Sequence, residues 1–169
     1  NGTSVNNPGN AQRYDFRGKP NTGTFAMNVA APTGPLPEDR QQTLVGNPYP
    51  SALDARAYLY DLENVTAITE TLYYWEQAAN GTHFTSGYEG GYGTYTINAA
   101  GTADSYIPAI FLSYDNQGNP TGPSGGSVPK TARRFIPVGQ GFMVEGRVGS
   151  SGIVFAKNNM RAFYKESST

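Results

Sequence analysis

Short runs in which apolar and polar residues alternate recur along the chain, separated by turns rich in glycine, proline and asparagine. A period of two predicts strands, because successive side chains of a strand point to opposite faces of a sheet. Such runs occupy residues 24–29, 43–45, 68–76, 94–98, 107–114, 138–145, 152–155 and 160–164. Many short strands joined by ordered turns predict an all-β fold, and we expect a β-sandwich with jelly-roll-like connections.

We expect one domain over residues 13–169, preceded by an extended arm at residues 1–12, which are rich in Asn, Gly and Ser. No repeat of fixed period and no interdomain linker interrupts the pattern. The complete predicted core is Phe25, Leu44, Val45, Leu53, Leu72, Trp75, Ile110, Leu112, Phe142, Val144 and Phe155.

A stiff elbow is predicted where the run at 43–45 ends. Its two prolines, Pro48 and Pro50, fix their own φ angles and push the preceding residues towards extended backbone. Ser51 is suited to cap a following helix, with Asp54 reaching back as in a capping box. We therefore expect one short helix at 51–62 and a structural elbow made of Gly46, Asn47, Pro48, Tyr49, Pro50, Ser51 and Asp54.

The amino-acid composition limits the classes of partner that the protein is expected to bind. Lys and Arg number 12 against 13 Asp and Glu, and the net charge of -1 argues against a nucleic-acid-binding surface. No apolar run approaches the roughly 18 residues that a membrane-spanning helix needs, so we expect no membrane insertion. The chain has no cysteine, which removes disulfides and thiol chemistry.

Residues that would carry catalysis or bind a metal are sparse. The one histidine, His83, has no Cys and no carboxylate pair beside it, as a zinc site would need. The segment Asp115–Asn119 lacks the later bidentate Glu of a calcium loop, so a hairpin turn is favoured. We predict no catalytic residues, no metal and no cofactor, and hence a protein that is not an enzyme.

Tyrosines among glycines give the clearest functional signal. Tyr88, Tyr92 and Tyr95 are interleaved with Gly87, Gly90, Gly91 and Gly93. Tyrosine offers wide contact area at low entropic cost, so these rings are candidates for stacking on sugars or on a neighbouring copy of the chain. The alternative is a tyrosine-rich loop folded onto its own sheet.

Four segments occur in an order that carries a family resemblance: Gly46–Asp54, Leu72–Glu76, Ile136–Val144 and Phe155–Arg161. Together they resemble a β-rich module of Bacteroidetes surface proteins, in which the module precedes a C-terminal sorting domain for type IX secretion. That domain does not follow Thr169, so we expect either a fragment or a smaller protein that uses the module alone. The resemblance implies export and surface attachment and supplies no catalytic residues.

These observations lead to one functional expectation and one alternative. We expect a non-catalytic extracellular module at the cell or outer-membrane surface, with a structural, adhesive or self-assembling role. Its partners would be further copies of itself, through edge strands or the arm at 1–12, or a surface polysaccharide. The alternative is a carbohydrate-binding accessory module of a larger secreted protein, in which the tyrosines contact glycan.

Overall fold

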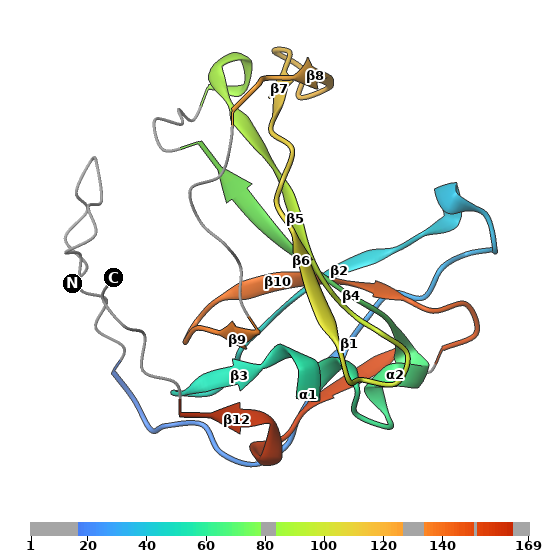
Figure 1. The fold of residues 1–169 in the computed structure, drawn as a ribbon, viewed down its shortest axis with the longest axis vertical. Helices are drawn as coiled ribbons and strands as arrows, with labels where there is room; N and C mark the ends of the chain where they lie inside the picture. Colours follow the sequence, from blue (N-terminus) through green and yellow to red (C-terminus); the bar gives the residue numbers. More distant parts are fainter. Residues whose placement is uncertain (1–16, 79–83, 127–133, 151, 164–169) are drawn as a thin grey trace.

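Residues 17–78, 84–126, 134–150 and 152–163 are described here from a computed structural model of the chain. Within them the chain forms antiparallel sheets with two short α-helices (Figure 1). The prediction of an all-β fold is confirmed.

The largest sheet has seven strands, in the order β2-β10-β4-β5-β7-β8, with β6 also paired to β5. Its strands are β2 (Gln42–Gly46), β10 (Gly141–Gly146), β4 (Ile68–Gln77), β5 (Glu89–Ile97), β7 (Leu112–Tyr114), β8 (Pro120–Pro123) and β6 (Asp104–Ile107). The neighbours β2 and β10 are far apart in the sequence. The large sheet therefore forms only when these two distant segments come together.

Two smaller sheets complete the fold. One pairs β1 (Phe25–Asn28) with β11 (Ile153–Ala156), and the other has the order β12-β3-β9, formed by Arg161–Ala162, Ala52–Asp54 and Phe135–Ile136. The helices are α1 (Ala55–Leu59) and α2 (Asn64–Ala67), with 3-10 turns η1 (Pro37–Asp39), η2 (Thr85–Gly87) and η3 (Asn158–Met160).

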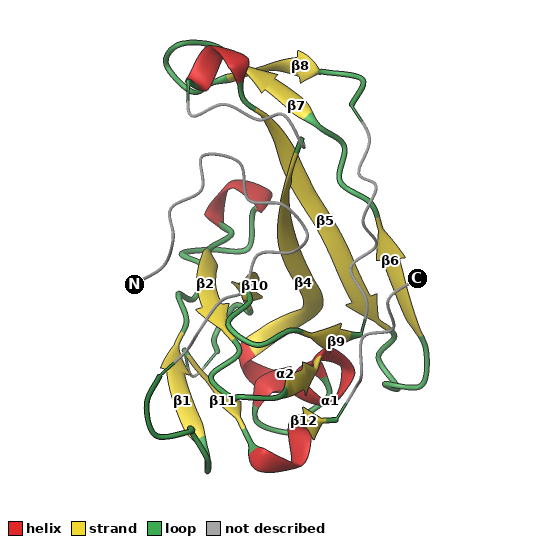
Figure 2. Ribbon diagram, turned by 90° about the vertical axis from the view of Figure 1, so that its left-hand side faces the viewer, coloured by secondary structure: helices red, strands yellow, loops and turns green. Residues whose placement is uncertain are grey.

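The strands β4 and β5 are the longest, and they run well beyond the body of the molecule. Figures 1 and 2 show the two smaller sheets and both α-helices gathered around one end of these strands, while the other end projects and carries β7 and β8 at its tip. The strand register supports this extension, because β5 pairs with β4 without a break from Thr96 to Gly90.

One hydrophobic core joins all three sheets. Alternate residues of the large sheet, including Leu72, Tyr74 and Phe142, pack with Leu53 from β3 and Val154 from β11. The Tyr58 ring of α1 meets the Phe142 ring edge-on, with 5.6 Å between centroids. Among the described residues, the smaller sheets and helices thus cover one face of the large sheet, as in a sandwich, and the opposite face is left uncovered along β2, β10, β4 and β5.

The predicted helix at 51–62 is wrong at both ends. Residues 52–54 form β3, because Leu53 is paired on both sides, with Arg161 and with Ile136. The helix α1 begins after Asp54, whose carboxylate accepts hydrogen bonds from the N–H groups of Arg56 and Ala57. Asp54 is therefore the N-cap itself, and a second helix, α2, follows where none was expected. Pairing between distant strands overrides the local capping signal at Ser51.

Three residues of the predicted core are exposed. Leu44 is 69% exposed, Trp75 39% and Ile110 71%, whereas Val45, Leu53, Leu72, Phe142 and Val144 are buried as expected. Phe25, Leu112 and Phe155 are half-buried. Leu44 and Trp75 lie on the uncovered face of the large sheet, which the alternation alone does not distinguish from the covered one.

The expected arm at 1–12 and His83 lie outside the described residues, as do the Asn-x-Thr sites at Asn1 and Asn80. The third such site, Asn64, is fully buried in α2. Its side-chain amide donates to the carbonyls of Tyr58 and Phe155, and its oxygen accepts from the Phe155 N–H. Asn64 thus stabilises the fold, and its amide nitrogen is not accessible for glycosylation.

Candidate functional site

The uncovered face of the seven-stranded sheet, which we call the open face, is defined by the strand register. Two side-chain contacts confirm which residues share it: Thr71 and Thr96 hydroxyls lie 3.0 Å apart, and the Tyr73 hydroxyl donates to Glu145 at 3.1 Å. By register and alternation its side chains are Gln42, Leu44, Thr71, Tyr73, Trp75, Gln77, Tyr92, Thr94, Thr96, Ser105, Ile107, Met143 and Glu145.

An aromatic cluster lies on the open face where β4 and β5 leave the body. Trp75 and Tyr92 are opposite each other in the register, with ring centroids 4.9 Å apart. Tyr88 stacks nearly parallel to Trp75, at 5.9 Å and 10°. The Tyr88 hydroxyl accepts a hydrogen bond from the Trp75 indole N–H and donates one to the Gln77 amide oxygen. These contacts hold the rings in one arrangement before any partner arrives.

A glycine on β5 makes room for the indole. A Cβ added at Gly90 would lie 2.5 Å from Cζ2 of Trp75, so only glycine lets the ring lie flat on the neighbouring strand. Such coverage of a strand glycine by an aromatic ring compensates for the packing that glycine lacks. The glycines between the tyrosines are therefore part of the aromatic surface itself.

A row of side chains crosses the sheet beside this cluster. The register aligns Leu44 with Met143, Met143 with Tyr73, Tyr73 with Thr94 and Thr94 with Ile107. Ile107 is 62% exposed, like Leu44 at the other end of the row. The open face therefore presents apolar and hydroxyl groups across five strands.

Charge is almost absent from the open face. Among its side chains given above, only Glu145 is ionisable to a carboxylate, and it is 8% exposed. One of its oxygens lies 3.6 Å from the Arg40 guanidinium and the other accepts from Tyr73. Burial and the neighbouring Glu145 carboxylate raise the pKa of Tyr73 to about 12, so its hydroxyl stays protonated as a donor.

Of the three tyrosines predicted as a contact group, the sheet separates one from the other two. Tyr88 and Tyr92 lie in the aromatic cluster, whereas Tyr95 is 2% exposed in the core and donates to Asp104. The correction follows from parity, since residue 95 differs from residue 92 by an odd number of positions along β5. The same parity argument places Tyr73 and Trp75 together on the open face of β4.

The predicted elbow is held by Asn47. Its buried side-chain N–H groups donate to the carbonyls of Ser51, Ile136 and Pro137 at 2.8, 3.2 and 3.0 Å, and its oxygen accepts from the Tyr49 N–H. Tyr49 is buried against Phe25 and donates its hydroxyl to the Gly23 carbonyl. These bonds join segments from both ends of the chain, which is a role in the fold.

Within the described ranges, no group of three or more His, Cys, Asp or Glu side chains is arranged to hold a metal. Asp115 closes the β7–β8 hairpin by accepting from the N–H groups of Gln117 and Asn119, as the hairpin prediction required. These bonds and the Asn119 side chain lower the pKa of the Asp115 carboxyl.

A shallow depression of about 470 Å³ beside α1 contains two arginines. Arg134 is bound through two hydrogen bonds to Asp54, and Arg56 lies 4.0 Å from Asp104. Both cations are matched by carboxylates, so the depression does not favour an anion. None of the described helices is long and apolar enough to cross a bilayer.

Comparison with known proteins yields one assignment. Neither the curated proteins nor the solved structures include a significant match to the chain. A family model described as "Domain of unknown function (DUF8693)" matches residues 1–169, the whole chain. The chain therefore belongs to the family of that domain.

Proposed function

We propose that this chain is a non-catalytic, extracellular binding module that attaches to a neutral polysaccharide through its open face. The observation that carries the proposal is the aromatic cluster: Trp75 is 39% and Tyr92 43% exposed, their rings contact each other, and Trp75 also stacks on and hydrogen-bonds to Tyr88. Sugar rings present C–H faces that pack on aromatic rings, and a pre-organised surface binds at lower entropic cost.

The polar groups of the open face suit the same ligand. Gln77, Thr71, Thr94 and Thr96 offer amide and hydroxyl groups beside the rings, matched to the hydroxyl groups of a sugar chain. The open face carries one buried carboxylate and no exposed charge on its strands. A neutral glycan loses no ionic hydration on such a surface, and the cation beside it, Arg40, is already paired with Glu145.

The apolar surface of this face has the size of a functional patch. The exposed parts of Leu44, Trp75, Tyr92 and Ile107 together amount to an area on the order of 400 Å². Patches of about 300–600 Å² are often functional on monomeric proteins.

The extracellular location rests on the resemblance to modules of exported Bacteroidetes surface proteins. The segments that carry it, Gly46–Asp54 and Ile136–Val144, are joined in the fold by the Asn47 hydrogen bonds to Ser51, Ile136 and Pro137. An adhesive role at the cell surface requires no catalytic residue, and the aromatic cluster provides the contact.

Affinity electrophoresis tests the proposal. The protein is run through gels containing hydroxyethylcellulose, xyloglucan or galactomannan as neutral polysaccharides, and alginate as an acidic one. We expect at least one neutral polysaccharide to retard the protein, and the variants Trp75→Ala and Tyr92→Ala to lose about tenfold or more in affinity, the equivalent of about 1.4 kcal/mol.

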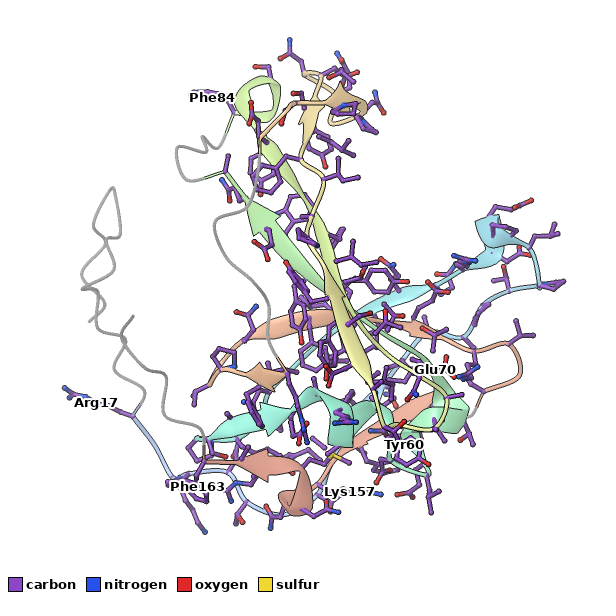
Figure 3. All side chains as sticks on the ribbon, in the orientation of Figure 1. Arg17, Tyr60, Glu70, Phe84, Lys157 and Phe163 are labelled. Carbon is purple, nitrogen blue, oxygen red and sulfur yellow. The ribbon has the colours of Figure 1, made fainter. Side chains whose placement is uncertain are left out.

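The control is Phe163→Ala. Phe163 is 96% exposed and lies at the opposite end of the molecule from the projecting strands (Figure 3). We expect the Phe163→Ala variant to be retarded by the polysaccharide as strongly as the unchanged protein. Equal retardation of Trp75→Ala would place binding elsewhere, and retardation by alginate alone would contradict a neutral ligand.

A further inference from the structure

The outer edge of β2 has free backbone hydrogen-bonding groups. Two backbone hydrogen bonds show which residues of β2 are bonded to β10. The Asn47 N–H donates to the Gln140 carbonyl, and the Gly146 N–H donates to the Gln41 carbonyl. In an antiparallel pair the bonded residues alternate, so Thr43 and Val45 bond to β10. The N–H and C=O groups of Gln42, Leu44 and Gly46 point the other way, and no other described segment bonds to them.

Three other edge strands, β8, β6 and β11, carry features that protect them from such pairing. β8 carries Pro120 and Pro123, and β6 carries Asp104. On β11, the outward N–H and C=O groups of Phe155 are bonded to the Asn64 side chain. Proline, charge and side-chain capping are the devices that keep edge strands from pairing with another chain. The sequence Gln42–Gly46 contains neither proline nor charge, and Leu44 is 69% exposed on it.

We propose that β2 pairs antiparallel with β2 of a second copy of this chain, about a two-fold axis at Leu44. Outward residues then meet in register: Leu44 faces Leu44 of the second copy, and Gln42 faces Gly46 of the second copy. The pairing makes about six backbone hydrogen bonds. The surface is self-complementary, as a closed two-fold interface requires, and the uncharged strand adds no repulsion.

The joined sheets have a functional consequence. Residues directly opposite each other in a sheet share a face, so the two open faces lie on the same side of one continuous sheet. Each Leu44–Met143–Tyr73 row then continues into the row of the second copy. Two aromatic clusters on one side can engage one polysaccharide chain, which raises avidity without any new contact. The edge interface is small, and we expect the free dimer to be weak.

Directed disulfide formation tests this pairing in the full chain. The protein has no cysteine, so Leu44→Cys introduces a single thiol that can bridge only between copies. Opposite residues of a bonded antiparallel pair have Cα atoms about 5.5 Å apart, within the range of a disulfide. Under mild oxidation we expect Leu44→Cys to dimerise at least tenfold faster than Leu62→Cys, which is also highly exposed but lies after α1. Equal rates would overturn the proposal.

Sedimentation velocity provides the second measurement, without a covalent bond. The variant Leu44→Lys places a charge on the pairing axis and should abolish the dimer of the unchanged protein at millimolar concentration. Its control is Ala26→Lys, which adds the same charge to the exposed strand β1. A dimer that survives Leu44→Lys and disappears in Ala26→Lys would assign the interface to β1 and contradict pairing through β2.

Discussion

Trp75 lies flat over Gly90 of the neighbouring strand, so closely that an added Cβ would approach its Cζ2 to 2.5 Å. The same added atom would lie 2.9 Å from the Glu76 carbonyl oxygen, which belongs to the backbone and cannot move aside. The identity of residue 90 therefore determines where the indole ring lies, and with it the shape of the aromatic cluster.

The variant Gly90→Ala is expected to displace Trp75 from β5 and to lower the free energy of unfolding by about 1–3 kcal/mol, the cost typical of overpacking. Polysaccharide retardation should fall with it. Urea denaturation followed by the fluorescence of Trp75, the single tryptophan, measures both stability and ring environment. Gly46→Ala is the control, because its added Cβ meets nothing closer than 3.5 Å. Equal effects of the two variants would contradict this role of Gly90.

Replacing Asn47 by Ala removes the donor for three carbonyls, those of Ser51, Ile136 and Pro137. The Pro137 carbonyl keeps the Gln140 N–H as a donor, whereas the Tyr49 N–H loses its acceptor. A buried group left without a partner costs about 1–3 kcal/mol, so we expect Asn47→Ala to destabilise by about 3 kcal/mol. Thermal denaturation measures the change. Asn28→Ala, on the exposed side of β1, should leave the Tm nearly unchanged. A Tm for Asn47→Ala close to that of Asn28→Ala would mean that the elbow does not depend on these bonds.

Tyr74 and Tyr95 should respond oppositely to loss of their hydroxyl groups. The Tyr74 hydroxyl is buried without a hydrogen-bond partner among the described residues, whereas that of Tyr95 donates to Asp104 at 2.9 Å. Tyr74→Phe removes an unpaired polar group and should leave stability unchanged or raise it by about 1 kcal/mol. Tyr95→Phe should lower it by about 1–2 kcal/mol. Chemical denaturation of both variants measures these changes in the free energy of unfolding. A clear loss of stability in Tyr74→Phe would indicate that the Tyr74 hydroxyl has a partner outside the described residues.

Alkaline pH should destabilise the fold. Burial raises the pKa of Tyr58, Tyr74 and Tyr95, and raises that of Tyr73 to about 12, from an ordinary value of 10.0. Above pH 10 the unfolded chain loses these protons before the folded one, so the folded state binds more protons and stability falls as pH rises. Urea midpoints should therefore be constant from pH 8 to 9.5 and decline from about pH 10 to 12. A midpoint that rises over that interval would contradict the burial of these tyrosines.

The period-two pattern predicted the strands because it depends only on local geometry: Leu72, Tyr73, Tyr74 and Trp75 do alternate between faces. The pattern does not say which face is covered, since that depends on β3, β11 and α1 packing against Leu72 and Tyr74. The prediction of Trp75 as a core residue is therefore wrong, and its ring lies on the open face.

The elements that could not be predicted from the sequence depend on pairing between strands that are far apart in the chain. Ser51 carries a local signal for a helix start, but β3 forms there because Arg161 and Ile136 pair with Leu53. The register that aligns Leu44 with Tyr73 through Met143 joins three segments far apart in the sequence. The tyrosines of the candidate site were predictable as a group, and the parity of their positions along β5 separates Tyr95 from Tyr92.

Quenching of the single tryptophan by acrylamide tests the binding face most directly, because Trp75 lies within the proposed contact and no other indole contributes. The protein is titrated with the neutral polysaccharide that retards it in gels, with alginate as the comparison. The account predicts a saturable shift in Trp75 emission and at least a twofold fall in the quenching constant on the neutral polysaccharide alone. Unchanged quenching at saturating polysaccharide would contradict it, because the ligand would then be bound away from the open face.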